Sequence, residues 1–163
     1  MTKPVLVGLV STTVFVLDQL TKWWIRQTLQ PGESIGVLES CFQIVHARNP
    51  GGAFSFLAGA HEGFRTVFFL VASVVAIGVL VHVLRSTPAS NRLLTFALAG
   101  LLGGALGNLV DRVRLGHVTD FLDVHWSGYH WPAFNVADSF ISVGLCILVV
   151  HVLFGSDAAE REQ

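Results

Sequence analysis

Long stretches without a charged side chain constrain this protein most. Three of them lack Asp, Glu, Lys and Arg altogether and cover residues 66–84, 93–110 and 139–156. A helix needs about 20 predominantly apolar residues to cross the roughly 30 Å hydrocarbon core of a bilayer, and each stretch comes close to that length. A shorter one, residues 4–17, continues past Asp18 to Trp23 and Trp24, an aromatic pair typical of the membrane interface.

The composition supports four membrane spans and argues against a soluble fold. Hydrophobic residues make up 52% of the 163 residues and charged residues only 13%, so the chain could not bury its apolar surface in water. The first apolar stretch runs into Asp18 and Lys22 instead of a small-residue cleavage site, so we expect a retained span and no cleaved signal peptide. A net charge of −1 implies no nucleic-acid partner. Cys41 lies in a polar loop and Cys146 within a span, which predicts two unpaired thiols.

These observations predict an all-α polytopic membrane protein that forms a single membrane-embedded domain over residues 1–163. The four transmembrane helices are expected at about residues 4–26, 63–84, 92–113 and 134–154. Both termini and the short link at 85–92 then share one side of the membrane, and the long loops at 27–62 and 114–133 share the other. The first loop contains a β-like stretch at 41–46, whereas the second is expected to be a mixed loop.

Counting cations beside the spans does not fix the orientation of the protein. The long-loop side carries more of them, which would place the long loops in the cytoplasm, but several stand beside carboxylates and would serve a site equally well. They are Lys3, Arg85, Arg92 and Arg161 on the terminal side, and Lys22, Arg26, Arg48, Arg65, Arg112 and Arg114 on the long-loop side.

The third predicted span carries glycines at helical spacing. They are Gly100, Gly103, Gly104 and Gly107. A helix without Cβ atoms on one surface lets another helix approach closely, and close packing drives helix association in lipid. We expect this surface to pack within one chain, because a four-helix protein needs a tight internal contact, and we therefore expect a monomer.

The carboxylates outside the C-terminal tail gather at one level of the predicted bundle. Most of them lie at the long-loop ends of the spans, at Asp18, Asp111, Asp120, Asp123 and Asp138. An ionisable group at the centre of a membrane helix costs about 2.5–3.5 kcal/mol on insertion scales, so such groups tend to mark function. We therefore expect one polar layer at this end.

Two motifs with the same spacing border this layer. Asn108, Asp111 and Arg112 fall on one face at the end of the third span, where the guanidinium is expected to hold a carboxylate through two parallel hydrogen bonds. Asn135 and Asp138 open the fourth span, and Asn135 is also placed to cap that helix.

The first span contributes a third polar pair. Asp18 and Lys22 are four residues apart, which predicts an intrahelical ion pair. Direct contact with a reacting substrate is the alternative role for the two residues.

Two carboxylates held close at a poorly solvated membrane edge cannot both ionise easily, so one keeps its proton while the other is charged. Such a pair can activate a water molecule and protonate a leaving amine, as peptide hydrolysis requires. The residue pattern leaves open whether Asp111 or Asp120 pairs with Asp138. A small proton-coupled transporter is the alternative function, although a relay needs carboxylates spread across the membrane and these lie at one end.

Other chemistries fit the sequence less well. Zinc binding lacks a His-Glu-x-x-His motif, although several residues of the second long loop are possible ligands, namely His117, Asp120, Asp123, His125 and His130. We expect no metal and no cofactor. No Gly-x-Ser-x-Gly motif supports serine chemistry. A purely structural role is disfavoured because burying Arg112 with several carboxylates would cost free energy without serving a function.

Five motifs follow one another along essentially the whole chain. They are Asp18-Gln19-x-x-Lys22, Asn49-Pro50-Gly51-Gly52-Ala53-Phe54-Ser55, Gly103-Gly104-Ala105-Leu106-Gly107-Asn108-Leu109-Val110-Asp111-Arg112, Val118-Thr119-Asp120-Phe121 and Phe134-Asn135-Val136-Ala137-Asp138-Ser139. In this order and spacing the chain resembles the bacterial lipoprotein signal peptidases (signal peptidase II). Thr119, where that family often has Val, is a small departure that does not touch the carboxylates.

The resemblance implies four spans in the bacterial inner membrane, cytoplasmic termini, and a small periplasmic β-cradle between helices 1 and 2. It implies Asp120 and Asp138 as the catalytic pair, with base and acid unassigned. The implied supporting residues are Asn49, Asn108, Asp111, Arg112, Asn135, Asp18 and Lys22. The implied reaction cleaves a prolipoprotein before its diacylglyceryl-modified Cys, and cyclic lipopeptides are expected to compete with this substrate.

Overall fold

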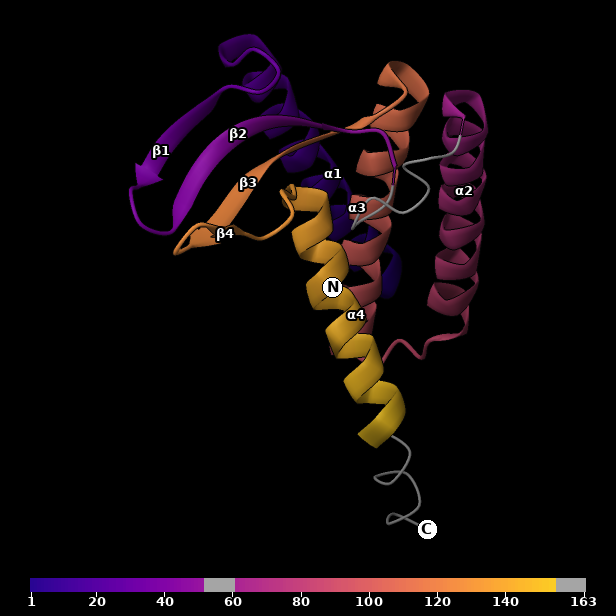
Figure 1. Ribbon diagram of the computed structural model, residues 1–163. Helices are drawn as coiled ribbons and strands as arrows, with labels where there is room; N and C mark the ends of the chain where they lie inside the picture. Colours follow the sequence, from indigo (N-terminus) through magenta and orange to yellow (C-terminus); the bar gives the residue numbers. More distant parts are fainter. Residues whose placement is uncertain (52–60, 155–163) are drawn as a thin grey trace.

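A computed structural model describes residues 1–51 and 61–154 and contains four long helices (Figure 1). They are α1 (Lys3–Thr28), α2 (Glu62–Ser86), α3 (Arg92–Leu115) and α4 (Val136–Phe154). Each is long and apolar enough to cross a membrane. Every observed bound lies within about two residues of the expected one, because uncharged runs mark apolar helices directly.

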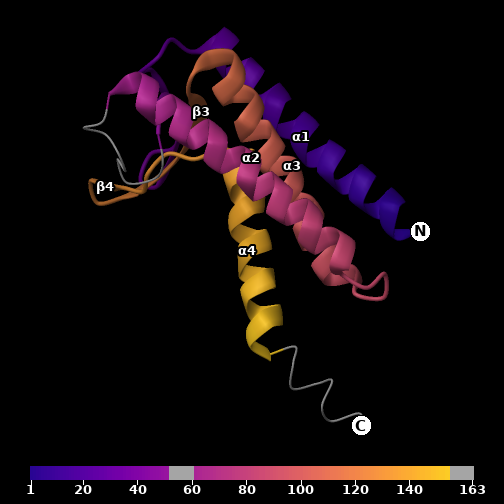
Figure 2. The same ribbon diagram turned by 90° about the vertical axis from the view of Figure 1, so that its right-hand side faces the viewer.

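Helix α3 is the centre of the fold. It packs against α1, α2 and α4, and its buried Leu94, Leu98 and Leu101 form the hydrophobic core together with Leu84 of α2. Figure 2 shows α1 and α3 side by side, while α4 diverges from them away from the sheet. The central helix therefore presents side chains to every other span.

Two glycines of α3 allow its neighbours to come close. A Cβ atom added at Gly103 would lie 2.5 Å from the backbone oxygen of Ser11 in α1, and one added at Gly104 would lie 2.7 Å from the backbone oxygen of Ala137 in α4. Real Cβ atoms do not approach other atoms so closely. The glycine surface thus packs within the chain, as predicted, and it seats α1 and α4 against different sides of α3.

A four-stranded antiparallel sheet lies at one end of the helices. Its strands are β1 (Ser34–Leu38), β2 (Phe42–Asn49), β3 (Val118–Trp126) and β4 (Tyr129–His130), in the order β1-β2-β3-β4. The prediction of an all-α chain with β structure only between helices 1 and 2 was therefore incomplete, since β3 and β4 lie between α3 and α4. The first half of β3 is buried continuously, so it lacks the alternation that marks an exposed strand.

The turn after α3 brings the second half of the sheet back to the helices. Gly116 ends α3 with a φ of 74°, in the left-handed region that glycine tolerates. Strand β3 then pairs with β2, with Asn49 opposite Val118 and Ala47 opposite Asp120. The sheet thereby joins the two long loops, and Asp120 reaches the end of the helices.

The start of α1, the end of α4 and the α2–α3 link lie away from the sheet (Figure 2). This arrangement agrees with the predicted placement of both long loops at one end of the bundle. Cys41 and Cys146 are free, as expected. Part of the motif at 49–55 falls within residues 52–60 and lies outside the described residues.

Candidate active site

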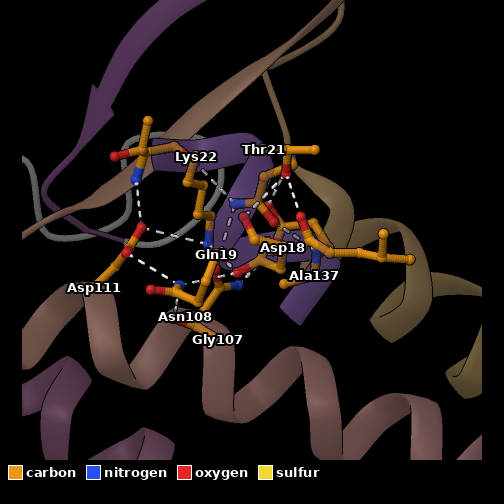
Figure 3. A network of polar contacts seen from close by, with 12 residues as sticks. Asp18, Gln19, Thr21, Lys22, Gly107, Asn108, Asp111 and Ala137 are labelled. Atoms are coloured by element: carbon orange, nitrogen blue, oxygen red, sulfur yellow. Dashed lines mark hydrogen bonds and ion pairs between the residues drawn. The ribbon is translucent and has the colours of Figure 1, made fainter. Parts of the chain in front are cut away.

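An ion-pair network connects α1 to α3 (Figure 3). Asp18 and Lys22 are fully buried, and the ammonium of Lys22 lies 2.8 Å from Asp18 Oδ2. The same ammonium donates a hydrogen bond of 2.7 Å to Asn108 Oδ1 and lies 3.4 Å from Asp111 Oδ2. The predicted intrahelical pair is confirmed, and it also fixes two polar residues of α3.

The network continues to the start of α4. Asp18 Oδ1 accepts a hydrogen bond of 3.0 Å from the backbone N–H of Ala137. This contact requires Gly107, because a Cβ atom added there would collide with the Asp18 carboxylate. One buried carboxylate thus fixes the entrance of α4 beside α3.

Asp111 is held by cations and by the backbone of β3. Besides Lys22, it has Arg26 Nη1 at 3.7 Å and accepts a hydrogen bond of 3.1 Å from the backbone N–H of Thr119. Gln19 Nε2 lies 3.3 Å from its other oxygen and donates to it. These contacts hold the Asp111 side chain in place and anchor the strand that carries the next carboxylate.

Asp120 and Asp138 have amide partners instead of cations. Asp120 is 2% exposed, and it accepts hydrogen bonds of 2.6 Å from Asn135 Nδ2 and 3.0 Å from Asn49 Nδ2. Asp138 accepts a hydrogen bond of 2.8 Å from Asn108 Nδ2. Among residues 1–51 and 61–154, no ion pair joins a Lys or Arg to Asp120 or Asp138.

Asn135 serves both the helix and the carboxylates. Its Oδ1 accepts a hydrogen bond of 2.9 Å from the backbone N–H of Asp138, and its own backbone N–H lies 3.3 Å from Asp138 Oδ2. This reciprocal pair has the form of a capping box, in which each residue satisfies a free N–H of the helix start. The predicted cap is therefore present, and the side-chain N–H of the same residue binds Asp120.

The two carboxylates face different electrostatic conditions. Burial, and secondly the negative charge of Asp138, raises the pKa of Asp120 from 3.8 to about 7. The hydrogen bonds from Asn49 and Asn135 act in the opposite direction. Asp138 stands in the first turn of α4, where the free N–H groups of a helix stabilise a negative charge. Below about pH 7 the arrangement therefore favours the protonated form of Asp120.

Arg112 does not form the predicted pair of parallel hydrogen bonds. Its Nη1 donates to the backbone oxygen of Asn108 at 3.2 Å, and its guanidinium carbon lies 5.8 Å from the centre of the Phe69 ring. Its charge is within electrostatic reach of Asp138 and Asp120. The guanidinium is therefore placed between the α3 backbone and α2, beside the carboxylates and not clamped on one.

Sequence reasoning missed three residues of this network, namely Gln19, Arg26 and Thr119. Arg26 Nη1 also donates to the hydroxyl of Thr119 at 3.1 Å. A signal for Arg26 was present, because Asp18, Lys22 and Arg26 recur every four residues and form one polar face on an otherwise apolar helix.

Known proteins similar to this chain identify its family. The family model described as Signal peptidase (SPase) II matches residues 10–154. The lipoprotein signal peptidase of Desulforapulum autotrophicum is 48% identical over 147 residues, which cover 90% of both chains. That of Geobacter sulfurreducens is 51% identical over 138 residues, which cover 85% of both chains.

Two solved bacterial membrane enzymes share the fold of this chain. A bacterial membrane enzyme solved at 2.3 Å superposes with a TM-score of 0.81 at 33% identity, over 90% of this chain and 87% of that chain. A second one, solved at 1.9 Å, gives a TM-score of 0.79 at 32% identity. The chain belongs to the signal peptidase II family, and it is an aspartic-type peptidase with several membrane-spanning helices.

Proposed function

We propose that this chain removes signal peptides from prolipoproteins by hydrolysing the peptide bond just before the diacylglyceryl-modified Cys, with Asp120 and Asp138 as the catalytic pair. The observation that carries this assignment is the contrast between two sets of carboxylates. Amide groups bind Asp120 and Asp138, whereas Lys22 binds Asp18 and Asp111. A cation would keep both members of a pair ionised, while amide donors fix their positions and allow one to keep a proton.

In this mechanism Asp138 is the general base and Asp120 the general acid. Ionised Asp138 takes a proton from a water molecule, whose oxygen bonds to the scissile carbonyl carbon, while Asp120 transfers its proton to the carbonyl oxygen. The tetrahedral intermediate then collapses: one of its hydroxyl protons returns to Asp120, a C=O bond forms again and the C–N bond breaks. The proton taken from water passes to the leaving amine, which returns the pair to its starting state.

The space beside the pair suits an apolar signal helix. A pocket of about 270 Å³ between α3 and α4 is lined by Phe96, Gly100, Ser139 and Phe140, among others. Ser139 follows Asp138 directly, so the pocket begins next to the proposed base. A signal helix packed there would place its end at the carboxylates, while the acyl chains of the substrate remain in lipid and fix the position of the cut.

The supporting residues divide by contact. Asn108 and Asn135 orient the pair, and Asn49 binds Asp120. The network of Asp18, Lys22 and Asp111 holds α1, α3 and β3 in place. Arg112 supplies positive charge that lowers the cost of gathering carboxylates. We assign none of these supporting residues a bond-making step.

The proposed orientation places the sheet on the periplasmic side of the inner membrane and the termini in the cytoplasm. Trp126 and Tyr129 on the sheet are 77% and 83% exposed, which suits a sheet that rests on the membrane interface. In a variant with Ser at Cys41 and Cys146, the two free thiols, a membrane-impermeant maleimide added to intact cells should label a Cys placed at Glu39 and should not label one placed at Ser90. Both positions are exposed, in the β1–β2 turn and the α2–α3 link respectively, and the reverse labelling would invert the orientation.

The chain is proposed to act as a monomer, since its glycine surface is already occupied by α1 and α4. Cyclic lipopeptides that insert a polar group between the two carboxylates should compete with the substrate. No observation favours the transporter alternative, because the middle parts of α2, α3 and α4 carry no carboxylate through which a proton could cross.

Cleavage of a diacylated prolipoprotein by the purified protein in detergent tests the proposal. Asp120→Asn and Asp138→Asn should each abolish cleavage with a chelator present throughout, while the control Glu39→Gln, in an exposed turn of the sheet, should cleave like the wild type. If Asp120→Asn cleaves normally and Asp111→Asn does not, the pair is misassigned. If the wild type never cleaves this substrate, the proposed reaction at the bond before the modified Cys is wrong.

A further inference from the structure

Three side chains outside the catalytic pair converge on the β3–β4 hairpin. They are Asp123, His125 and His130, and one nitrogen or carboxylate oxygen from each lies within 4.8 Å of the others. The sequence shows no zinc-binding motif for these residues. They come together through pairing between strands, whereas the motif sought in the sequence depends on helical spacing. We name these three residues the hairpin cluster.

Strand geometry explains the convergence. Asp123 and His125 are two residues apart on β3 and therefore project from the same face. His130 of β4 is paired directly opposite His125, and paired residues of antiparallel strands share a face. The two imidazole rings stack with centroids 4.9 Å apart, and His130 Nδ1 lies 2.9 Å from Asp123 Oδ2.

Two further features prepare these groups for a ligand. Gln43, opposite Asp123 on β2, donates a hydrogen bond of 2.6 Å to Asp123 Oδ2 and so fixes the carboxylate in the way that outer groups orient metal ligands. His125 Nδ1 is buried and has no hydrogen-bond partner among the described residues. A buried ring nitrogen without a partner is uncommon, because leaving it unmatched is costly.

We propose that the hairpin cluster binds one first-row divalent cation of the Zn²⁺ type. Two imidazoles and one carboxylate are a donor set that zinc accepts, with bonds of about 2.0–2.2 Å and a fourth position left for water. Ligand atoms on such an ion stand closer together than 4.8 Å, so the side chains must close in. His130 can do this, because its side chain is 51% exposed.

The proposed ion is separate from the chemistry of peptide cleavage. Asp120 accepts hydrogen bonds from Asn49 and Asn135. Asp123 has other partners, Gln43 and His130, so the two carboxylates share no hydrogen-bond partner. The ion would join β3 to β4 and thereby stabilise the strand that carries Asp120, without contacting the substrate.

Zinc titration of the tag-free, metal-stripped protein in detergent tests the site. Calorimetry should show one bound Zn²⁺ per chain, and Zn²⁺ should raise the melting temperature. His125→Ala and His130→Ala should each weaken binding at least tenfold and remove the thermal shift. His82→Ala, which removes an exposed histidine of α2, should bind like the wild type.

The proposal fails if the wild type shows no saturable binding, or if both cluster variants bind Zn²⁺ as tightly as His82→Ala. Each variant must elute as the wild type does and keep its metal-free melting temperature. If His125→Ala does not meet these conditions, His130→Ala decides the outcome, because the His130 side chain is half exposed. A hairpin held only by the Asp123–His130 hydrogen bond would show no response to zinc.

Discussion

Raising the pH above 7 should stop cleavage by removing the proton from Asp120. Burial and the charge of Asp138 raise the pKa of this carboxyl from 3.8 to about 7. At 1.36 kcal/mol for each pKa unit, its ionised form is disfavoured by about 4 kcal/mol relative to a free aspartate. Asp120 is thus protonated below about pH 7 and loses its role as a proton donor above it.

The assay is kcat/KM for a diacylated prolipoprotein between pH 5 and 9. Above about pH 7 the rate constant should fall tenfold for each further pH unit, as expected when one essential proton is lost. Asn49→Ala removes a donor that stabilises the ionised Asp120, so it should raise the pKa and move the fall to higher pH. The control Asn91→Ala removes the N-cap of α3, at the end of the helix away from the site. It should leave the midpoint of the pH dependence unchanged.

Stability should respond with the corresponding sign. Because the pKa of Asp120 is raised in the folded state, its contribution to stability is fully present below pH 3.8 and is lost as the pH rises through about 7. The melting temperature should therefore decrease from pH 5 to 8, and less so in Asp120→Asn. A rate that stays constant from pH 7 to 9, with equal pH dependence of melting in both proteins, would refute this reasoning.

Three further substitutions test, in turn, a close packing contact, a buried ion pair and a contact far from the site. Gly104→Ala should lower stability by about 1–3 kcal/mol and reduce cleavage, because the new methyl group meets the α4 backbone. The control Gly78→Ala adds a methyl group with nothing within 4 Å, so it should be neutral or slightly stabilising in thermal melts. Lys22→Met leaves buried Asp18 without its cation and Asp111 with Arg26 alone. It should cost about 3–5 kcal/mol, measured by denaturant unfolding. Lys3→Met removes hydrogen bonds to backbone oxygens at the end of α2 and should cost about 0.3–1 kcal/mol with kcat/KM unchanged; a loss of activity there would contradict the proposed site.

The helices could be predicted from the sequence because a membrane span is a local property of about 20 consecutive residues. The sheet could be predicted only in part. Strand β2 has a β-like composition of its own, whereas β3 is defined by pairing with residues about 70 positions earlier, such as Asn49 opposite Val118. Such pairing leaves no local pattern when the strand is buried over Val118 to Phe121, so the sequence showed a loop there.

The same distinction applied to the polar residues. Spacing showed that Asp18 and Lys22 share a helix face, but it could not show that Lys22 also reaches Asp111, which lies on another helix. Without that contact Asp111 and Asp120 were equivalent candidates to pair with Asp138. The tertiary fold separates them, since one meets cations and the other meets amides.

This difference in partners gives a physical reason for the asparagines around the proposed pair. Two carboxylates could be held together most strongly by a shared lysine or arginine, but such a cation would lower the pKa of both and leave no proton to donate. An amide N–H fixes a carboxyl group without that large effect on its charge, as Asn135 does for Asp120 at 2.6 Å and Asn108 does for Asp138 at 2.8 Å. The cation is placed one layer away, where Lys22 holds Asn108 by its oxygen at 2.7 Å and so turns the amide N–H towards Asp138. Lysine therefore orients the pair through an amide while leaving the charge of the pair free to change.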